Sequence, residues 1–174
     1  LAEESMGNVG SKHVLLIGTG EIAGLVAKSL NKKGYAFDVT SKTIERATGF
    51  SKILGGNPIE FGGVLPGLDK FDIIFVATTA DAFLITFDKI NKVMKKKKKG
   101  TLMMDLSEPR TVDEKVATIP GIKLVNPAQI AEMIEPSTIA RKSAISAAEE
   151  MIKEELPIIV ATMNQLGSEP LVKA

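Results

Sequence analysis

The stretch Val14-Leu-Leu-Ile-Gly-Thr-Gly-Glu-Ile-Ala-Gly24 decides the fold of this 174-residue chain. Its first four residues are all apolar, which is typical of a strand buried on both faces of a sheet. The strand runs directly into Gly18-Thr19-Gly20, and a helix is expected over residues 21–33. A glycine-rich turn between a strand and a helix is typical of a loop that binds phosphate groups.

The small residues of this turn suit the binding of a dinucleotide. Gly18 permits the tight turn, Gly20 lets the backbone approach a pyrophosphate, and Ala23 lets the helix pack closely on the strand. Backbone amides at the helix start then hold the anion, and the helix dipole helps them. The alternative is a structural turn without a ligand. The predicted pyrophosphate-binding residues are Gly18, Thr19, Gly20, Glu21, Ile22 and Ala23.

The residues after the second expected strand, 35–40, indicate which dinucleotide is bound. A domain that binds NAD places an acid near this point, where the acid binds the ribose hydroxyls. Here Ser41-Lys42-Thr43 follows the strand, so that a cation is flanked by two hydroxyls. Asp38 lies earlier, within the strand, and we interpret it as structural. The sequence therefore predicts NADP(H) over NAD(H), with a solvated surface lysine as the alternative for Lys42.

Strands and helices alternate from residue 14 to about residue 135, which predicts a parallel sheet with helices on both faces. Further strands are expected over residues 58–61, 72–77, 101–106 and 121–125, and further helices over residues 43–54 and 81–99. The first helix is expected to bury one face, made of Ile22, Leu25, Val26, Ser29 and Leu30. Capping boxes at Thr111–Glu114 and Asn126–Gln129 predict two more helix starts.

The chain is expected to divide into four segments, of which the central one is a doubly wound, Rossmann-like domain with a mainly parallel sheet. From residue 138 onward, apolar residues recur at helical spacing, which predicts a long amphipathic helix. The predicted segments are the end of a preceding linker helix (1–12), the NADP-binding domain (13–136), the long helix (137–166) and a tail (167–174).

Composition excludes several classes of protein. The 22 basic and 21 acidic residues leave a net charge of +1, so there is no global attraction to nucleic acid or to an anionic membrane. No apolar run reaches the roughly 18 residues of a membrane-spanning helix. The absence of cysteine excludes disulfides and a thiolate nucleophile, and a cytoplasmic setting is expected. The chain begins with Leu1, which suggests a fragment or a processed chain.

Polar residues follow two of the expected strands at the edge where ligands bind in such folds. Thr78 and Thr79 follow Ala77, and we expect them either along the ribose or nicotinamide of the cofactor or as caps of the next helix. Three charged residues lie at or after the end of the strand over residues 101–106, and they either orient a substrate, contact a neighbouring domain, or form an internal ion pair with a capping role. These residues are Asp105, Glu108 and Arg110.

His13 is the single histidine, and it precedes the first strand, away from this edge. No spacing suits a metal site, and no catalytic residue is predicted.

Five segments in this order resemble the NADPH-binding domain of glutamyl-tRNA reductase, over roughly residues 15–152. They are GTGEIAG, TSKTIERA, FDIIFVATT, LMMDLSEPRTVD and NPAQIAEMIE. The segment TSKTIERA alone also resembles shikimate dehydrogenases, in which an Asn-Arg-Thr triplet reads the 2′-phosphate. DLSEPRTVD followed by a long helix favours the reductase.

The resemblance implies that residues 18–23 hold the pyrophosphate of NADPH, that Ser41, Lys42 and Thr43 hold its 2′-phosphate, and that Ala77–Thr79 lie along it. The family often has glycine where Ala23 stands, and Asn-Arg where Ser41-Lys42 stand. The second change exchanges a bidentate guanidinium for a point charge, so a lower affinity for the phosphate is expected.

The same resemblance implies the reduction of glutamyl-tRNA to glutamate-1-semialdehyde, the first committed step toward tetrapyrroles. The family's nucleophile is a cysteine of a separate N-terminal domain, and its C-terminal domain dimerises. This chain lacks both, so it is expected to bind NADPH and to catalyse nothing alone. Glutamyl-tRNA and a second copy are the partners implied for the parent protein. The lysine run 95–99 is either a tRNA contact or a solvated helix end, and we favour the latter.

Two other functions fit the same residues. One is a free-standing NADP-dependent dehydrogenase of the shikimate dehydrogenase type, for which no convincing lysine–aspartate pair is found. The other is a non-catalytic nucleotide-binding module that dimerises through the long helix.

Overall fold

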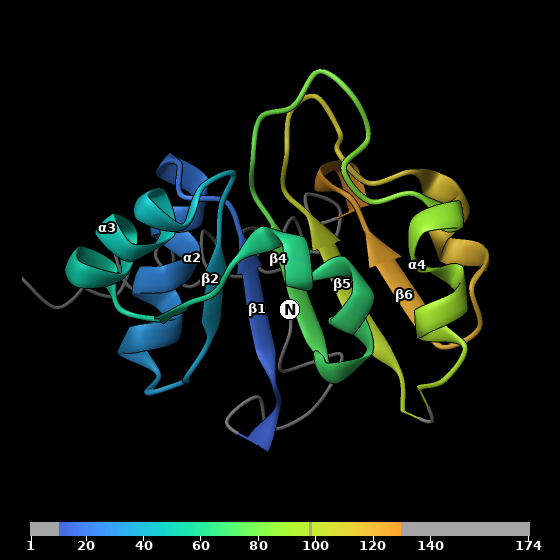
Figure 1. The fold of residues 1–174 in the computed structure, drawn as a ribbon, viewed down its shortest axis with the longest axis horizontal. Coiled ribbons are helices and arrows are strands. Elements are labelled where there is room, and N and C mark those ends of the chain that lie inside the picture. The colour runs from blue at the N-terminus through green and yellow to red at the C-terminus, as the bar shows by residue number, and fades with distance from the viewer. Residues whose placement is uncertain (1–10, 98, 130–174) are drawn as a thin grey trace, which may run out of the picture. The chain divides into compact units, whose positions relative to one another are not determined.

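The computed structural model describes residues 11–97 and 99–129, which form a six-stranded parallel sheet with helices on both faces (Figure 1). The strand order is β3-β2-β1-β4-β5-β6, and every neighbouring pair is parallel. The predicted doubly wound, Rossmann-like class is confirmed. The strands are β1 (Val14–Ile17), β2 (Asp38–Thr40), β3 (Asn57–Pro58), β4 (Ile73–Val76), β5 (Thr101–Asp105) and β6 (Ile122–Val125).

Apolar side chains alternate between the two faces of the sheet and build two cores. On one face, Leu16 and Phe75 pack with residues of the helices α2 and α3. On the other face, Leu15 and Ile74 pack with residues of α4 and of two short 3-10 helices. The helices are α2 (Glu21–Lys32), α3 (Ile44–Leu54), α4 (Phe87–Met94), η2 (Phe61–Gly63), η3 (Leu65–Lys70) and η4 (Glu114–Thr118).

The predicted buried face of helix α2 is only partly correct: Leu30 is buried and Val26 packs against the core, but Ser29 is exposed. Ile22 is 47% exposed and Leu25 is 58% exposed, although both were expected in the core. The side that packs on the sheet carries mostly small residues instead, which let the helix approach the strands closely. The buried residues of α2 are Ala23, Gly24, Ala27 and Leu30.

The predicted helix over residues 81–99 is much shorter in the structure. Helix α4 begins at Phe87, after the N-cap residue Thr86. The amides of Leu84 and Ile85 donate instead to the carbonyl of Thr111, at 2.7 and 3.2 Å, and Ile85 forms an isolated parallel bridge with Val112. A tertiary contact therefore replaces the first helical turns.

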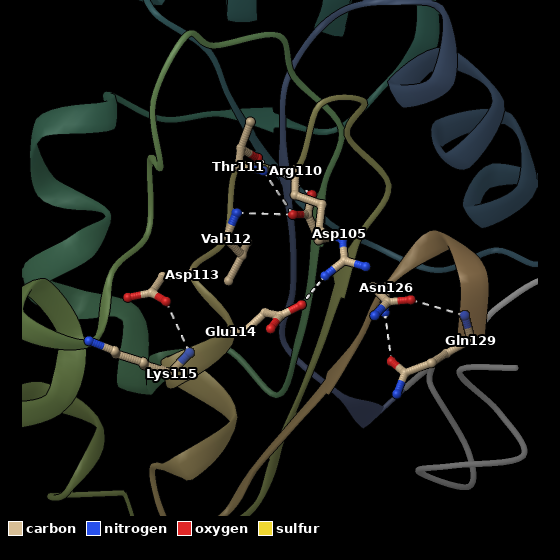
Figure 2. A network of polar contacts seen from close by, with 9 residues as sticks. All are labelled: Asp105, Arg110, Thr111, Val112, Asp113, Glu114, Lys115, Asn126 and Gln129. Atoms are coloured by element: carbon tan, nitrogen blue, oxygen red, sulfur yellow. Dashed lines mark hydrogen bonds and ion pairs between the residues drawn. The ribbon is translucent and has the colours of Figure 1, made fainter.

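The capping box predicted at Thr111–Glu114 is wrong. Thr111 is buried and bonds to Asp105, while the cap of η4 is Asp113, whose side chain accepts from the amide of Lys115. The second predicted box is confirmed: Asn126 and Gln129 exchange two hydrogen bonds of 3.0 Å (Figure 2).

The remaining boundaries shift by a few residues. Strand β2 begins at Asp38 rather than at residue 35, and β3 ends at Pro58, because Phe61 already begins η2. The predicted long helix and tail lie outside the described residues, as do residues 1–10 of the predicted linker helix. Within the described ranges, no helix is both long enough and apolar enough to cross a membrane.

Candidate nucleotide-binding site

The turn after β1 can only be made by glycine at its first position. Gly18 has a φ of 122°, and a Cβ atom there would lie 2.0 Å from the carbonyl oxygen of Ala77. The amide of Gly18 donates to the carbonyl of Thr40 at 2.8 Å. Gly18 is thus held between the carboxyl ends of β2 and β4, where a side chain would clash with the backbone.

Gly20 leaves space in front of the first turn of α2. It is the N-cap residue of α2 and provides no side-chain cap. The first helical hydrogen bond runs from the amide of Gly24 to the carbonyl of Gly20, so the amides of residues 21–23 lie ahead of it. A Cβ atom on Gly20 would meet no atom within 4 Å. Amide donors beside open space fit a pyrophosphate group.

A pocket of about 380 Å³ lies at the carboxyl ends of β1, β2 and β4. This is the point where the strand order reverses, since β2 lies on one side of β1 and β4 on the other. Five of the residues predicted from the sequence line it together: Gly18, Ser41, Lys42, Thr78 and Thr79. The rest of the lining is Ile17, Phe61, Ala80, Asp81 and Leu84.

A second hollow, of about 730 Å³, lies between α2 and α3. Three more predicted residues line it, namely Thr19, Gly20 and Glu21. The Thr19 and Ser41 hydroxyls, 3.2 Å apart, connect this hollow with the 380 Å³ pocket. A ligand that occupied both spaces would pass along this pair.

Four predicted residues line neither space. Ala23 and Ala77 are buried, while Ile22 is exposed. Thr43 is the N-cap of α3, and its hydroxyl accepts from the amide of Arg46 at 3.4 Å.

Two cations of the larger hollow were missed by sequence reasoning. Arg46 and Lys28 line it beside Thr19 and Gly20. The segment TSKTIERA contained the signal for Arg46, because a residue three positions after the N-cap Thr43 lies on the first turn of α3. Lys28 lies two turns after Glu21, on the same face of α2.

The two threonines after β4 do not cap a helix, because α4 begins only at Phe87. Thr78 and Thr79 lie on the pocket wall instead. A hydrogen bond of 3.3 Å from the amide of Thr78 to the hydroxyl of Ser107 holds the backbone of this wall.

The three charged residues after β5 have separate surroundings. Asp105 is only 1% exposed, so it cannot orient a substrate, and its carboxylate accepts hydrogen bonds from the loop that follows it (Figure 2). Arg110 forms an ion pair with Glu114 at the surface, and Glu108 is exposed. The predicted internal ion pair is therefore absent from the described residues, and Asp105 instead holds a loop.

The opposite edge of the sheet also carries charged groups. Lys97 was predicted as part of a solvated lysine run, but its side chain is 9% exposed, and its ammonium lies 3.1 Å from the Asp72 carboxylate. His13 is exposed beside them, and its backbone amide donates to Asp72 at 3.1 Å. Within residues 11–97 and 99–129, no cluster of acids and histidine could hold a metal ion.

Comparison with known proteins identifies the family and the fold. A sequence profile described as Shikimate / quinate 5-dehydrogenase matches residues 1–133. The chain belongs to the shikimate/quinate 5-dehydrogenase family. This family and the fold imply a nicotinamide cofactor.

Within that family, the chain is similar to proteins named glutamyl-tRNA reductase, as its sequence predicts. It is 49% identical to the one from Cenarchaeum symbiosum over 174 residues, which are the whole of this chain and 42% of that protein. The structure of glutamyl-tRNA reductase from Methanopyrus kandleri matches 95% of this chain, with 29% identity, a TM-score of 0.83 and 42% of its own length covered.

A nucleotide-binding domain of the reductase from Thermoplasma volcanium shares the fold, with a TM-score of 0.60 at 17% identity, over 76% of this chain and 88% of that one. This chain thus spans about two fifths of the length of the curated relatives that it matches.

Proposed function

We propose that this chain is the NADPH-binding part of a glutamyl-tRNA reductase. The observation that carries the proposal is the pocket at the strand reversal, in which Gly18, Ser41, Lys42, Thr78 and Thr79 come together. The similarity to proteins of that name over the whole chain supports it.

Each part of the cofactor has residues of matching chemistry. Amides of residues 21–23 and the space in front of Gly20 suit the pyrophosphate. The ammonium of Lys42 and the hydroxyl of Ser41 suit a 2′-phosphate, with Arg46 as a second cation from α3. When bound, NADPH supplies a hydride to a carbonyl carbon of the substrate.

The preference for NADPH over NADH rests on charge. Asp38 is the acid closest to the end of β2. It accepts a hydrogen bond of 2.9 Å from the side-chain amide of Asn57, and it lines neither space of the site. The residues that follow β2 are Ser41, Lys42 and Thr43, which carry no negative charge to repel a 2′-phosphate.

The wider reaction needs groups that this chain does not contain. The acyl group of glutamyl-tRNA would be reduced to glutamate-1-semialdehyde after transfer to a cysteine, and this chain has none. We therefore propose that the whole protein supplies the cysteine and binds glutamyl-tRNA. We also propose that the whole protein acts as a homodimer. The chain alone binds NADPH and reduces nothing.

Fluorescence titration of the chain with NADPH and NADH tests the proposal. We expect tighter binding of NADPH. Lys42→Ala should weaken NADPH binding about tenfold, because a charge-assisted hydrogen bond is lost, and should leave NADH binding unchanged.

Lys52→Ala is the matched control for this titration, since Lys52 is an exposed lysine in the last turn of α3. Tighter binding of NADH, or an equal loss for both cofactors in Lys42→Ala, would contradict the proposed selectivity.

The family profile favours a second function, a shikimate-type dehydrogenase. Such an enzyme needs an acid–base residue near the nicotinamide. The ion pair between Lys97 and Asp72 lies at the amino ends of the strands, away from both spaces of the site. We expect no NADP-dependent oxidation of shikimate, and measurable turnover would favour this second function.

A further inference from the structure

The loop after β5 connects a buried carboxylate to the wall of the nucleotide pocket. Asp105 is the last residue of β5 and is 1% exposed. Its Oδ2 accepts from the amides of Thr111 and Val112, both at 2.9 Å (Figure 2). Its Oδ1 accepts from the amide of Ser107 at 3.1 Å. No cation pairs with Asp105 in the part of the chain that the structure describes. Backbone donors thus stabilise this buried charge.

Two chains of hydrogen bonds lead from this carboxylate to the pocket. In the first, the Thr111 hydroxyl lies 3.4 Å from Asp105 Oδ1 and 2.9 Å from the Ser107 hydroxyl. The Ser107 hydroxyl lies 3.4 Å from the carbonyl of Val76 and accepts from the amide of Thr78 at 3.3 Å. Ser107 therefore fixes the backbone at the point where β4 enters the pocket wall.

The second chain runs through the backbone of Thr111. Its amide donates to Asp105, and its carbonyl accepts from Leu84 and Ile85 at 2.7 and 3.2 Å. The amide of Asp113 also donates to the carbonyl of Ile85 at 2.9 Å. Leu84 lines the pocket, so this second chain fixes the far end of the same wall.

The segment between these two anchors has little support of its own. Residues 78–84 contain no helix or strand, yet Thr78, Thr79, Ala80, Asp81 and Leu84 all line the pocket. Across the pocket from this wall lie Ser41 and Lys42, which come from the end of β2. Both ends of this wall bond to residues that Asp105 holds, Ser107 at Thr78 and Thr111 at Leu84, and the Lys89 ammonium adds a bond of 3.1 Å to the Leu84 carbonyl.

We infer that Asp105 is a positioning residue, which sets the wall of the nucleotide pocket through Ser107 at Thr78 and through Thr111 at Leu84. The inference rests on the proposed function, because the pocket is the proposed site for the adenosine 2′-phosphate end of NADPH. Asp105 itself touches no ligand.

Two variants separate the two chains of hydrogen bonds. Asp105→Asn keeps the size of the side chain but replaces one acceptor oxygen with an NH2 donor. This new donor then faces backbone N–H groups, so hydrogen bonds to the loop are lost. Ser107→Ala removes the hydroxyl that contacts Thr78, Val76 and Thr111, but it leaves the bond from the Thr111 amide to Asp105 and hence the Leu84 end of the wall. The control is Thr101→Val at the other end of β5, where a buried hydroxyl donates to the carbonyl of Phe71 at 3.2 Å.

Amide hydrogen exchange and ligand titration of the full chain test the inference. In Asp105→Asn, exchange at Thr78 and Leu84 should accelerate, and the Kd values for NADPH and adenosine 2′,5′-bisphosphate should rise more than tenfold. In Ser107→Ala, only Thr78 should accelerate, and both Kd values should rise roughly fivefold. Thr101→Val should change neither reading, although it loses stability.

Unchanged exchange at both amides, or equal Kd changes in Thr101→Val and Ser107→Ala, would overturn the inference. Should Asp105→Asn fail to fold, Ser107→Ala still decides it. If the wild-type chain binds neither ligand, the proposed function is contradicted. The exchange rates at Thr78 and Leu84 in the variants then test the positioning role of Asp105 without the titrations.

Discussion

The two ends of the parallel sheet each enclose an aspartate, and they stabilise its charge in different ways. At the amino ends of the strands, Asp72 faces the ammonium of Lys97 at 3.1 Å and the amide of His13. At the carboxyl ends, Asp105 accepts hydrogen bonds from the amides of Ser107, Thr111 and Val112. One acid pairs with a cation, and the other accepts hydrogen bonds from the backbone of a loop.

This difference separates a structural edge from the edge that we propose binds the nucleotide, called the binding edge below. The amino edge pairs its charges with each other. At the carboxyl edge, Lys42 and Arg46 form no ion pair with any described residue, and the amides at the start of α2 face open space. Unpaired cations and free amides are what an anionic ligand requires. We therefore expect variants at the amino edge to change stability alone, and NADPH affinity to respond only to variants at the carboxyl edge.

The largest effect is expected for Gly18→Ala, at the binding edge. A Cβ atom would lie 2.0 Å from the Ala77 carbonyl oxygen, at a φ of 122° that an L side chain rarely adopts. The free energy of unfolding, measured by urea denaturation, should fall by about 3 kcal/mol.

Gly20→Ala is the control for this variant, because a Cβ atom there meets nothing within 4 Å. Gly20→Ala should lose less than about 1 kcal/mol of stability. Its NADPH binding should weaken about tenfold, because the methyl group enters the space proposed for the pyrophosphate. Equal stability losses in the two variants would contradict the claim that a side chain clashes at Gly18 but not at Gly20.

The next effect is expected at the structural edge. Lys97→Met removes the cation of Asp72 and also the donor of a 2.6 Å hydrogen bond to the carbonyl of Phe71. The free energy of unfolding should fall by about 2 kcal/mol, between the values for exposed and buried pairs. The affinity for NADPH should stay unchanged.

Lys96→Met, at an exposed neighbouring position, should leave stability within about 0.5 kcal/mol of wild type. A loss of NADPH affinity in Lys97→Met would break the proposed separation of the two edges.

The smallest effect is a pH dependence at Asp72. Burial raises the pKa of this carboxyl, but the His13 amide and the charges of Lys97 and Lys12 together outweigh burial and hold the pKa below its usual value of 3.8. The folded state therefore gains stability from Asp72 above the unfolded pKa and loses it as the pH falls through the folded pKa.

Urea denaturation across the acid range measures this contribution. Asp72→Asn should lose stability less steeply than wild type below about pH 4, by less than about 1 kcal/mol in total. If stability falls with pH at the same rate in both proteins, Asp72 does not contribute to the loss of stability in acid.

Sequence reasoning succeeded where the signal is local. The apolar run of β1, the glycine turn and the start of α2 are consecutive, and Ser41 with Lys42 directly follows a strand. Because the carboxyl ends of parallel strands share one edge, their convergence with Thr78 in one pocket could be anticipated.

It failed where distant segments decide the local structure. Leu84 bonds to Thr111 rather than to its own helical turn, and Thr111 bonds to Asp105 rather than capping a helix. The burial of Lys97 depends on Asp72, which lies far from it in the sequence. Arg46 was overlooked because its place beside Thr19 depends on how α3 packs against α2.

The position of β1 in the sheet has a consequence for synthesis of the protein. Strand β1 lies between β2 and β4, and its four residues are buried. During translation β2 emerges soon after β1, whereas β4 follows only after α3 and two short helices. Until Val76 has left the ribosome, β1 exposes an unpaired apolar edge, which is the kind of edge that aggregates with other chains. Nascent chains that stall before Val76 has emerged should therefore depend more strongly on chaperones than chains that stall after it.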